Sequence, residues 1–564
     1  MRLLPSTDVV IVGLGAGGGT AAEILTKAGL KVVGLEAGPY LTPQDFATAL
    51  DEIGGCHVRN DLGEVKYNKE MPTWRYNDSV AATDAPTFHN TRMMNGVGGS
   101  TVHYGALSWR LTPGDFRVRS DTIKRYGEHA LPPGTSIADW PVSYDDLEPY
   151  YDRVEYSIGV SGRGGANPFE GRRSRDYPMP PMRPAGFTKL AEKTMRALGY
   201  HPFPRPAAVN SVNYDGRAAC SYCGFCSGFA CWNDSKSSML VTAIRRAEKT
   251  GLLEIRPNCT VTRLSADRAN RVSGVQYRAP SGEMVEQPAK FVVLSTYVYE
   301  NVRRLLLSKS EAFPNGLSNN HGQVGKNYLT HTYLSMKGLF PGRDLNLFNG
   351  MFGQEMGFDD LYGDNFDHAN LGFIRGVSVF SDYQNLPIAT VGEVPPDVPR
   401  WGQAYKDWLK TNINSVGTLS ATVETLPYES NYLDLDPGLK TDPLGDPVIR
   451  VTYDVHENEK RMGEFADRHL DRILRAMGAT KTWPGNRPVA IPLSGHAFGG
   501  TRMGTDPAQS VVDGYSISHE VRNLAIFGGS TFPTVSSYNP TQTIQALSWR
   551  SSEYIAANFG RLTS

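Results

Sequence analysis

The stretch Asp8–Gly19, DVVIVGLGAGGG, decides the fold of this chain. Its apolar run predicts a buried strand, and the glycines that follow predict a tight turn. Residues 20–28 then predict a helix, which Gly29 ends, and residues 31–36, KVVGLE, predict a second strand. A strand, a helix and a strand in this order predict a β-α-β unit, and with it an α/β fold.

Gly13, Gly15 and Gly18 occupy the positions of a G-x-G-x-x-G motif at the start of that helix. The first glycine allows the tight turn, the second lets a pyrophosphate approach the backbone, and the third lets helix and strand pack closely. The N-terminus of the helix offers free N–H groups and a positive dipole end to phosphates. Glu36 ends the second strand about 20 residues on, where a carboxylate binds ribose hydroxyls. The stretch therefore predicts a site for an adenine dinucleotide, and a glycine turn without a ligand is the alternative.

The composition is that of a globular protein, with 40% hydrophobic and 20% charged residues. The chain has 564 residues, too many for one ordinary core, so we expect two interleaved or sequential domains. A formal net charge of -1 gives no reason to expect nucleic acid or an anionic membrane as a partner. No transmembrane segment is expected, because no apolar run reaches about 18 residues. The start, MRLLPST, lacks the pattern of a signal peptide, which predicts a cytoplasmic protein unless a partner subunit carries it through export.

A second glycine-rich turn lies at residues 95–104, NGVGGSTVHY. Gly98, Gly99 and Ser100 in this turn predict backbone N–H groups directed at an anion or a flat ring. Residues 41–90, which precede it, show no sustained hydrophobic period and predict a long excursion or lid.

Four of the six cysteines lie close together, with the spacing C-x2-C-x2-C-x4-C. Four thiols this close can surround one metal centre. Three interpretations fit: an iron–sulfur cluster that passes electrons to a partner, a structural tetrathiolate zinc, and reduced or disulfide-bonded cysteines that brace a loop. The clustered residues are Cys220, Cys223, Cys226 and Cys231. Cys56 and Cys259 stand apart and are interpreted as ordinary residues.

The C-terminal part carries the strongest chemical signal. His496 lies in a glycine-rich loop, SGHAFGGTRMG, and Gly528 and Gly529 follow a predicted strand, NLAIF. The last helix opens with Pro540 and Thr541, and its positive dipole end would favour an anion in front of it.

The first glycine motif, the turn NGVGGST and the C-terminal segments resemble, in this order, the glucose-methanol-choline (GMC) family of FAD oxidoreductases. The resemblance covers most of the chain. It implies FAD as the cofactor, His496 as the catalytic base and Asn539 as its partner on the substrate oxygen. The implied reaction is hydride transfer from an alcohol carbon to flavin N5 while the base removes the hydroxyl proton. FAD is favoured over NAD because these segments fit a fixed flavin ring.

The resemblance also implies further flavin contacts. The backbone of Val261 would reach the adenine. His103 matches by position a histidine that several relatives attach covalently to the flavin methyl carbon, and a histidine that packs beside the flavin and hydrogen-bonds it is the alternative. Residues 296–301, TYVYEN, depart from the small Ala-Gly turn that the family mostly has there.

The likeness is strongest to the catalytic subunits of bacterial FAD-dependent glucose and gluconate dehydrogenases. It implies a sugar, glycoside or polyol substrate and an electron acceptor such as a cytochrome or a small subunit. The cysteine spacing departs from that of the glucose dehydrogenase subunit, which holds a three-iron cluster. An oxidase that reduces O2 to H2O2 is the alternative enzyme, and a flavin-free binding subunit is the alternative outside enzymes.

The order of the segments predicts a discontinuous, Rossmann-like FAD-binding domain and a substrate domain with an antiparallel sheet. Residues 252–256 and 259–264 predict strands that pair with each other, and residues 458–477 predict a helix. The expected segments are FAD-binding 1–115 with its excursion, a substrate or cap segment 116–250 with the cysteines, FAD-binding 251–335, substrate-binding 336–494, and a C-terminal FAD-binding segment 495–564 with the catalytic residues.

Overall fold

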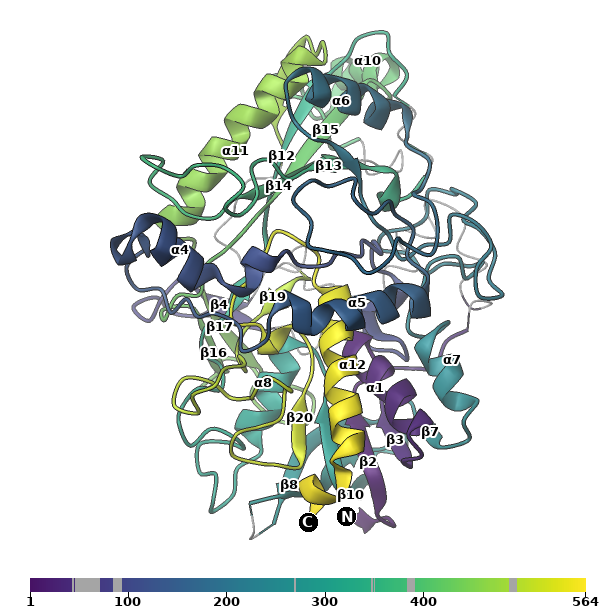
Figure 1. Cartoon of the computed structure of the whole chain (residues 1–564), viewed down its shortest axis with the longest axis vertical. Coiled ribbons are helices and arrows are strands. Elements are labelled where there is room, and N and C mark those ends of the chain that lie inside the picture. Colours follow the sequence, from purple (N-terminus) through teal and green to yellow (C-terminus); the bar gives the residue numbers. More distant parts are fainter. Residues whose placement is uncertain are drawn as a thin grey trace.

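The computed structural model of the chain describes residues 1–42, 45, 72–84, 94–267, 270–345, 348, 350–382, 391–485 and 495–564. Most of the excursion predicted at residues 41–90 lies outside the described residues, as does Cys56. The described chain is built on two large sheets, of eight and six strands. In Figure 1 the first lies in the lower half, where both termini are found, and the second lies above it.

The first sheet begins with the predicted β-α-β unit. Strand β2 (Thr7–Val12) leads into helix α1 (Ala16–Lys27), which returns to strand β3 (Val32–Leu35). Strands β2 and β3 pair in parallel, and β10 (Met284–Leu294) pairs in parallel with the other side of β2. These strands are almost continuously apolar and buried, as expected for a parallel sheet covered on both faces. The prediction of an α/β fold is confirmed.

Distant parts of the chain complete this sheet. Strand β7 (Leu253–Arg256) pairs in parallel with β3, and β20 (Leu524–Ile526) pairs in parallel with β10. Strands β8 (Thr260–Ala266) and β9 (Val272–Arg278) form an antiparallel ladder that continues to the first half of β10. The short strand β1 (Arg2–Leu3) also pairs with β10. The predicted pairing of residues 252–256 with 259–264 is therefore wrong, because β7 fills the parallel edge beside β3 and leaves β8 to its sequence neighbour β9.

Helices cover one face of the first sheet, where α1 and α12 lie side by side (Figure 1). The helices of this layer and its surroundings are α4 (Val118–Tyr126), α5 (Tyr144–Ile158), α7 (Ala243–Glu248), α12 (Thr541–Ala557) and α13 (Phe559–Thr563). Toward the opposite side, α8 (Val298–Leu307) contacts a small sheet. Its strands are β4 (Thr73–Arg75), β5 (Thr83–Asp84), β16 (Tyr432–Leu435) and β17 (Ile449–Thr452).

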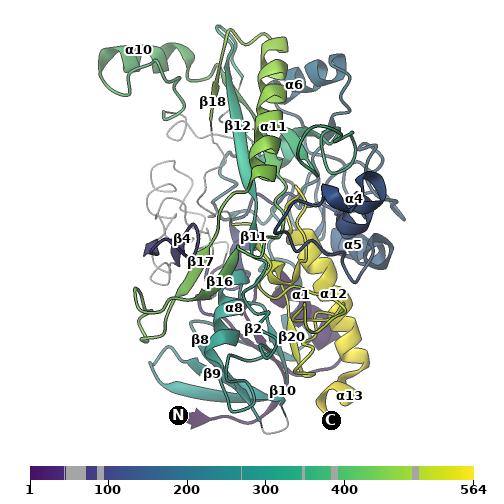
Figure 2. The same ribbon diagram turned by 90° about the vertical axis from the view of Figure 1, so that its left-hand side faces the viewer.

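The second sheet is antiparallel, in the order β18-β12-β15-β14-β13-β6. Its strands are β6 (Phe203–Pro204), β12 (Thr332–Leu339), β13 (Met356–Phe358), β14 (Val377–Asp382), β15 (Val416–Val423) and β18 (Lys481–Pro484). Helix α11 (Glu457–Ala476), at nearly the predicted bounds, and helix α6 (Gly186–Ala197) pack on one face. Helix α10 (Gly402–Asn412) projects from the end of this half (Figure 2).

Alternation along the strands gives this sheet an apolar and a polar face. Leu334 and Met336 of β12 point into the core shared with α11. Tyr333, Ser335 and Lys337 alternate with them on the opposite face. This polar face begins beside the C-terminal histidine, so the sheet extends outward from the candidate active site.

Candidate active site

The two glycine turns meet at the N-terminus of α1. Gly13 has φ +87°, and a Cβ there would lie 2.5 Å from the carbonyl oxygen of Ser295. A Cβ on Gly18 would lie 1.9 Å from the carbonyl oxygen of Gly13. A Cβ on Gly99 would lie 2.8 Å from the Cα of Gly15. Since side chains are excluded from this crossing, it presents backbone N–H groups and a helix dipole, and these features fit a pyrophosphate.

The second turn is built on the first. Gly98 has φ +97°, and its N–H donates to the carbonyl of Leu14 at 3.1 Å. The short 3-10 helix η4 (Gly99–Val102) follows, and the hydroxyl of Ser100 accepts from the N–H of Met94 at 3.1 Å. Residues 98–100 therefore lie at the same crossing as the G-x-G-x-x-G turn.

Glu36 lies buried at the end of β3, facing both turns. Its carboxylate accepts from three backbone N–H groups at 3.0–3.1 Å, those of Leu14, Gly38 and Gly96. Burial raises the pKa of Glu36 to about 7, against the lowering effect of these hydrogen bonds. The N–H of Cys259 donates to the Glu36 carbonyl at 2.8 Å, which brings Val261, at the start of β8, to the same end of the sheet. An adenosine that reached Val261 would thus also pass Glu36.

His103 ends η4, and its carbonyl accepts from the N–H of Gly228 in the cysteine loop at 2.8 Å. The buried ammonium of Lys236 ties the same loop to the segment after His103. It donates to three carbonyls, of Tyr104 at 3.0 Å, Cys226 at 2.8 Å and Phe229 at 2.6 Å. The cysteine loop is therefore fastened to the backbone that follows the second glycine turn.

The four clustered cysteines lie near enough for their charges to interact. Burial raises the pKa of Cys220 to about 11 and that of Cys226 to about 12, so both groups are thiols at neutral pH. The Sγ of Cys231 donates to Asn233 Oδ1 at 3.1 Å, and Cys223 is exposed. Among the described residues, no group of three or more His, Cys, Asp or Glu side chains has the arrangement of a metal site.

Two short strands bring the C-terminal histidine to its partners. Strand β19 (Ala497–Phe498) pairs with β11 (Leu329–Thr330), which places His331 beside His496. The N–H of His331 donates to the carbonyl of His496 at 3.2 Å. The turn after β20 packs behind β19, since a Cβ on Gly529 would lie 2.6 Å from the Ala497 carbonyl oxygen.

Asn539 completes the site from the start of α12. Gly528, with φ +123°, precedes the short 3-10 helix η8 (Gly529–Thr531), and Pro540 and Thr541 cap and begin α12. Asn539 Nδ2 lies 3.3 Å from Nε2 of His496. The structure therefore brings together the two residues expected to be catalytic. Burial lowers the pKa of His496 to about 4, so its imidazole is neutral at physiological pH and has one nitrogen lone pair.

The hydrogen bonds of His331 determine which nitrogen of His496 carries that lone pair. Nε2 of His331 lies 2.6 Å from the carbonyl oxygen of Ser536, which only accepts, so this nitrogen carries the proton. Burial, and repulsion from His496 whenever that ring is protonated, lowers the pKa of His331 well below its usual range, so His331 is neutral and its Nδ1 is unprotonated. Nδ1 of His331 lies 2.9 Å from Nδ1 of His496, and the latter must donate. Nε2 of His496 is therefore the basic atom, and it faces Asn539.

Tyr333 and Trp109 hold the same pair from two further sides. The phenol oxygen of Tyr333 lies 2.5 Å from Nδ1 of His496. Nε1 of Trp109 donates to Oδ1 of Asn539 at 3.1 Å, which turns the amide nitrogen toward His496. Trp109 stacks on Tyr538 with the ring centroids 4.4 Å apart, and Arg205 lies over the indole. The indole is thus packed between fixed neighbours.

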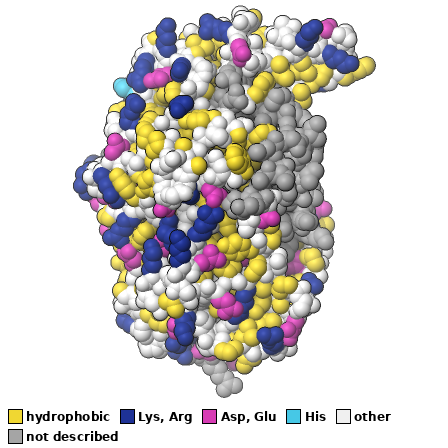
Figure 3. All heavy atoms as spheres, turned by 90° about the vertical axis from the view of Figure 1, so that its right-hand side faces the viewer, with side chains coloured by type: hydrophobic (Ala, Val, Ile, Leu, Met, Phe, Trp, Pro, Cys, Tyr) yellow, Lys and Arg dark blue, Asp and Glu magenta, His cyan; other side chains and the backbone are white. Residues whose placement is uncertain are grey.

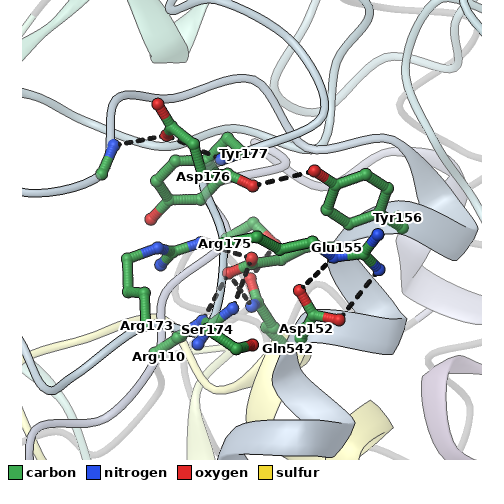
Figure 4. Close-up of polar contacts among 12 residues, drawn as sticks. Arg110, Asp152, Glu155, Tyr156, Arg173, Ser174, Arg175, Asp176, Tyr177 and Gln542 are labelled. Atoms are coloured by element: carbon green, nitrogen blue, oxygen red, sulfur yellow. Dashed lines mark hydrogen bonds and ion pairs between the residues drawn. The ribbon is translucent and has the colours of Figure 1, made fainter.

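A buried polar network joins the segment around Trp109 to the start of α12, and Figure 4 shows its members Arg110, Glu155 and Gln542. The guanidinium of Arg110 donates to both oxygens of Glu155 at 2.8 and 2.7 Å. Glu155 also accepts from Nε2 of Gln542 at 2.8 Å, and Gln542 Oε1 accepts from the hydroxyl of Ser108 at 2.6 Å. The segment 108–110 and the first turn of α12 are therefore joined through α5.

Tyr297 links the first glycine turn to the catalytic loop. It precedes α8 with φ +81° and ψ +163°, a backbone region that is essentially restricted to glycine. Its phenol donates to the carbonyl of Gly495 at 3.3 Å, next to His496, and its ring packs edge-on against Tyr299. The departure from the family's small turn, noted in the sequence, thus turns a bulky side chain away from the glycine crossing and toward the catalytic loop.

Sequence reasoning missed three residues of this site, His331, Tyr333 and Trp109. A signal for two of them was present, because His331 and Tyr333 are two apart in a β-branched run, THTY, and so lie on one face of an extended chain. Trp109 carried no local signal, since its contact with Asn539 spans most of the chain.

The fold and this site define a flavin-dependent oxidoreductase, and comparisons with known proteins agree. Two family models described as GMC oxidoreductase match residues 197–333 and 427–548. The chain is 32% identical to the gluconate 2-dehydrogenase flavoprotein of Pantoea cypripedii, over 99% of this chain and 94% of that protein. It is 29% identical to the fructose dehydrogenase large subunit of Gluconobacter japonicus, over 98% of each. The solved structure of a formate oxidase from Aspergillus oryzae matches the whole chain and 99% of its own, at 16% identity and a TM-score of 0.60.

The chain belongs to the GMC oxidoreductase family. It is accordingly an FAD-dependent enzyme that oxidises alcohol groups, and the prediction of an enzyme with this cofactor is confirmed. The formate oxidase shares the fold, which confirms the predicted Rossmann-like α/β architecture. Within the described residues, no helix is both long and apolar enough to cross a membrane.

Proposed function

We propose that this enzyme oxidises an alcohol group of a sugar, glycoside or polyol, with His496 as the base. The observation that carries the proposal is the orientation of the C-terminal pair. Nε2 of His496 holds a lone pair and the amide of Asn539 holds a donor, 3.3 Å apart, so one hydroxyl group can contact both. Such an oxygen would donate its proton to Nε2 while accepting from Nδ2 of Asn539.

The residues of the chain supply the proton chemistry. His496 removes the hydroxyl proton as the carbon–hydrogen bond breaks, because an alcohol releases hydride readily only when it is becoming an alkoxide. Asn539 holds the oxygen through this step, and the hydrogen bond from Trp109 keeps its amide from turning over. Bound FAD would supply the acceptor for the hydride of the alcohol carbon. Positioned acid–base catalysis of this kind contributes about 10²–10⁴-fold in rate.

We propose that the cofactor residues act as the sequence predicts. Gly13, Gly15 and Gly18 would hold the pyrophosphate, Glu36 the ribose, and Val261 the adenine. Gly98, Gly99, Ser100, Gly528, Gly529, Pro540 and Thr541 would surround the flavin end. The division into a discontinuous FAD-binding domain and a substrate domain, with the segment bounds given above, belongs to the same proposal.

The substrate class rests on the names of similar proteins, which act on gluconate, fructose and 2-methyl-1,2-propanediol. Several are dehydrogenases, and one is the large subunit of its enzyme, so we propose a dehydrogenase that passes electrons to a carrier such as a cytochrome or a small subunit. Two other relatives are named as oxidases, one of 6'''-hydroxyparomomycin C and one of paromamine. Release of H2O2 at the rate of turnover would favour an oxidase instead.

The experiment that tests the base is His496→Ala, assayed by anaerobic flavin reduction. We expect the variant to keep bound FAD and to lose about 10²–10⁴-fold in the reduction rate constant. His321→Ala is a matched control, because His321 is exposed and outside the site. Near-normal reduction by the His496 variant would reject the assignment.

His103 allows two states of the flavin, which one measurement separates. If His103 is bonded covalently to the flavin methyl carbon, acid-precipitated protein keeps its yellow colour. If His103 only packs beside the ring, the colour passes into the supernatant. Its position at the end of η4, after the second glycine turn, is compatible with both.

For the cysteines we propose the roles that the sequence offers as alternatives: an iron–sulfur cluster that would pass electrons to a partner, a structural zinc, or thiols that brace a loop. The support for the first is the attachment of the cysteine loop to the backbone after His103 through Gly228 and Lys236. Iron and sulfide in anaerobically purified protein would establish the cluster. Zinc alone would establish a structural metal, and absence of all three would leave the brace.

A further inference from the structure

A buried carboxylate lies close to the candidate active site without a part in the proton chemistry. Charged and hydrophobic side chains are interspersed over the face of the molecule that Figure 3 presents. Asp359, by contrast, is fully buried, and Tyr538, the residue before Asn539, is buried beside it. The phenol of Tyr538 donates to Oδ2 of Asp359. A buried carboxylate is costly unless it accepts hydrogen bonds, so this contact stabilises the acid and orients the phenol.

Asp359 is fixed on the second sheet. It directly follows β13, and the antiparallel pairing of β13 with β14 places it across from Ser378. The hydroxyl of Ser378 donates to Oδ1 of Asp359 at 2.9 Å, and Nδ2 of Asn167 donates to Oδ2 at 2.6 Å. The carboxylate is therefore held by two side chains in addition to Tyr538.

Tyr538 connects this fixed carboxylate to Asn539 in two ways. The two residues are adjacent in the chain, so a shift of the Tyr538 backbone also moves Asn539. The Tyr538 ring is nearly parallel to the indole of Trp109, at an angle of 7°, and that indole donates to Oδ1 of Asn539 at 3.1 Å. Tyr538 also stacks on Tyr362, with the ring centroids 4.8 Å apart. A phenol bound at its far end therefore fixes both the backbone before Asn539 and the support of its amide.

The two residues before Tyr538 are held in the same manner. In Figure 1 the segment before α12 reaches toward the second sheet. The carbonyl of Ser536 accepts from Nε2 of His331, which directly precedes β12, at 2.6 Å. The hydroxyl of Ser537 donates to Glu424, which directly follows β15, at 3.5 Å. The ends of three strands of the second sheet thus hold the three residues that lead to Asn539.

We propose that Asp359 is a positioning residue for the oxidation of the alcohol, because it holds Asn539 through Tyr538. The inference rests on the proposed function, since it takes Asn539 as the group that binds the substrate oxygen. A displacement of about 1 Å in such a group can cost about 100-fold in rate. A role in stability alone would leave the rate constant of flavin reduction unchanged in the folded, FAD-bound protein.

The first test is Tyr538→Phe, which keeps the ring and removes the donor to Asp359. We expect anaerobic flavin reduction at saturating substrate to slow about tenfold at unchanged FAD content, because a buried hydrogen bond to a charged group is lost. The matched control is Tyr428→Phe, which removes a phenol donor to another buried carboxylate, that of Glu459, at 3.2 Å. Tyr428 belongs to a separate apolar cluster. Both variants should unfold at lower urea concentration, but only Tyr538→Phe should reduce its flavin more slowly.

Two substitutions of the carboxylate test the same contact from the other side. Asp359→Asn keeps an oxygen that accepts from the phenol, whereas Asp359→Ala removes it. We expect Asp359→Asn to reduce its flavin at nearly the unchanged rate and Asp359→Ala to slow as much as Tyr538→Phe does. In a protein that already carries Asn539→Ala, Tyr538→Phe should slow reduction no further, because the group that it positions is absent.

The inference is overturned if Tyr538→Phe is reduced at the unchanged rate, or if it slows the Asn539→Ala protein by the same factor as the unchanged protein. If Tyr538→Phe does not fold, equal reduction rates of Asp359→Asn and Asp359→Ala overturn it. Asn539→Ala alone tests the proposed function. An unchanged rate there would reject the role of Asn539 and leave Asp359 nothing to position, whereas a slowed Asn539→Ala beside a normal Tyr538→Phe would reject only the inference.

Discussion

Replacing His331 by phenylalanine tests the argument that a second histidine selects the basic nitrogen of His496. The phenyl ring fills the same space, but it removes the acceptor that lies 2.9 Å from Nδ1 of His496. It also removes the donor to the Ser536 carbonyl. His496 would then be able to carry its proton on Nε2, the atom that must receive the substrate proton.

The expected loss follows from the burial of these groups. The Ser536 carbonyl loses its donor, and Nδ1 of His496 loses one of its two neighbours, since Tyr333 stays in place. A buried polar group that loses its partner costs about 1–3 kcal/mol. If this cost raises the activation free energy by the same amount, the rate of flavin reduction falls about 5- to 150-fold, since about 1.36 kcal/mol corresponds to a factor of ten. The assay is anaerobic stopped-flow reduction with a saturating sugar or polyol substrate, together with the FAD content of each preparation.

Tyr333→Phe is the matched comparison, because it removes a group from the same nitrogen and leaves His331 in place. We expect it to reduce the flavin faster than His331→Phe does. The reasoning is refuted if His331→Phe binds FAD normally and is reduced at the unchanged rate. It is equally refuted if the reduction rates of the two variants fall by the same factor, because His331 would then not be the residue that selects the protonated nitrogen of His496.

Five further predictions concern the site and its surroundings. Trp109→Phe frees the asparagine amide that the indole holds, and we expect about a tenfold loss of flavin reduction at unchanged FAD content, measured in the same assay. Because burial lowers the pKa of His496 from 6.5 to about 4, the reduction rate of the unchanged enzyme should stay level as pH falls through 6.5 and decline only near pH 4. Because of the same shift, His496 takes up a proton in the unfolded chain at a higher pH than in the folded protein. The free energy of unfolding should therefore fall by about 3 kcal/mol as pH drops from 6.5 to 4, and urea unfolding would measure this loss. Tyr297→Gly should be about 1–3 kcal/mol more stable than Tyr297→Ala, because only glycine relieves the strained backbone, and equal stabilities would exclude that strain. Glu155→Ala breaks a buried ion pair and should cost about 3–5 kcal/mol, whereas Asp152→Ala, which removes a surface pair on the same helix, should cost below about 1 kcal/mol.

The sequence was sufficient for those parts of the fold that local patterns determine. The β-α-β unit follows from an apolar run, a glycine turn and a helix of ordinary length, and the structure has all three within a few residues of the predicted bounds. The pairing of β7 and β8 was not predictable in this way. Both segments have strand patterns, but their partners depend on which sheet edge is open after distant strands have assembled.

In the candidate site, too, the residues in distinctive local segments were predictable, and those that depend on distant contacts were not. His496 and Asn539 stood out because each lies in a distinctive segment, and the structure places them 3.3 Å apart. Their supports, His331 and Trp109, are single residues whose roles depend on contacts across 165 and 430 positions of the chain. The cysteine spacing predicted a cluster of thiols. It could not predict that Lys236 fastens the loop by donating to three backbone carbonyls, which the structure shows.

The route of the chain through the first sheet has a consequence for biosynthesis. Strands β2 and β3 are complete by residue 35, but β20, which pairs with β10, and α12, which packs on α1, are made about 500 residues later. At about 5–20 residues per second, the ribosome needs about 25–100 s between them. During that interval the nascent chain exposes the apolar face of α1 and lacks Asn539. The candidate active site is therefore completed only after Asn539 and α12 have been made, and a chaperone that shields the early β-α-β unit would act before FAD can.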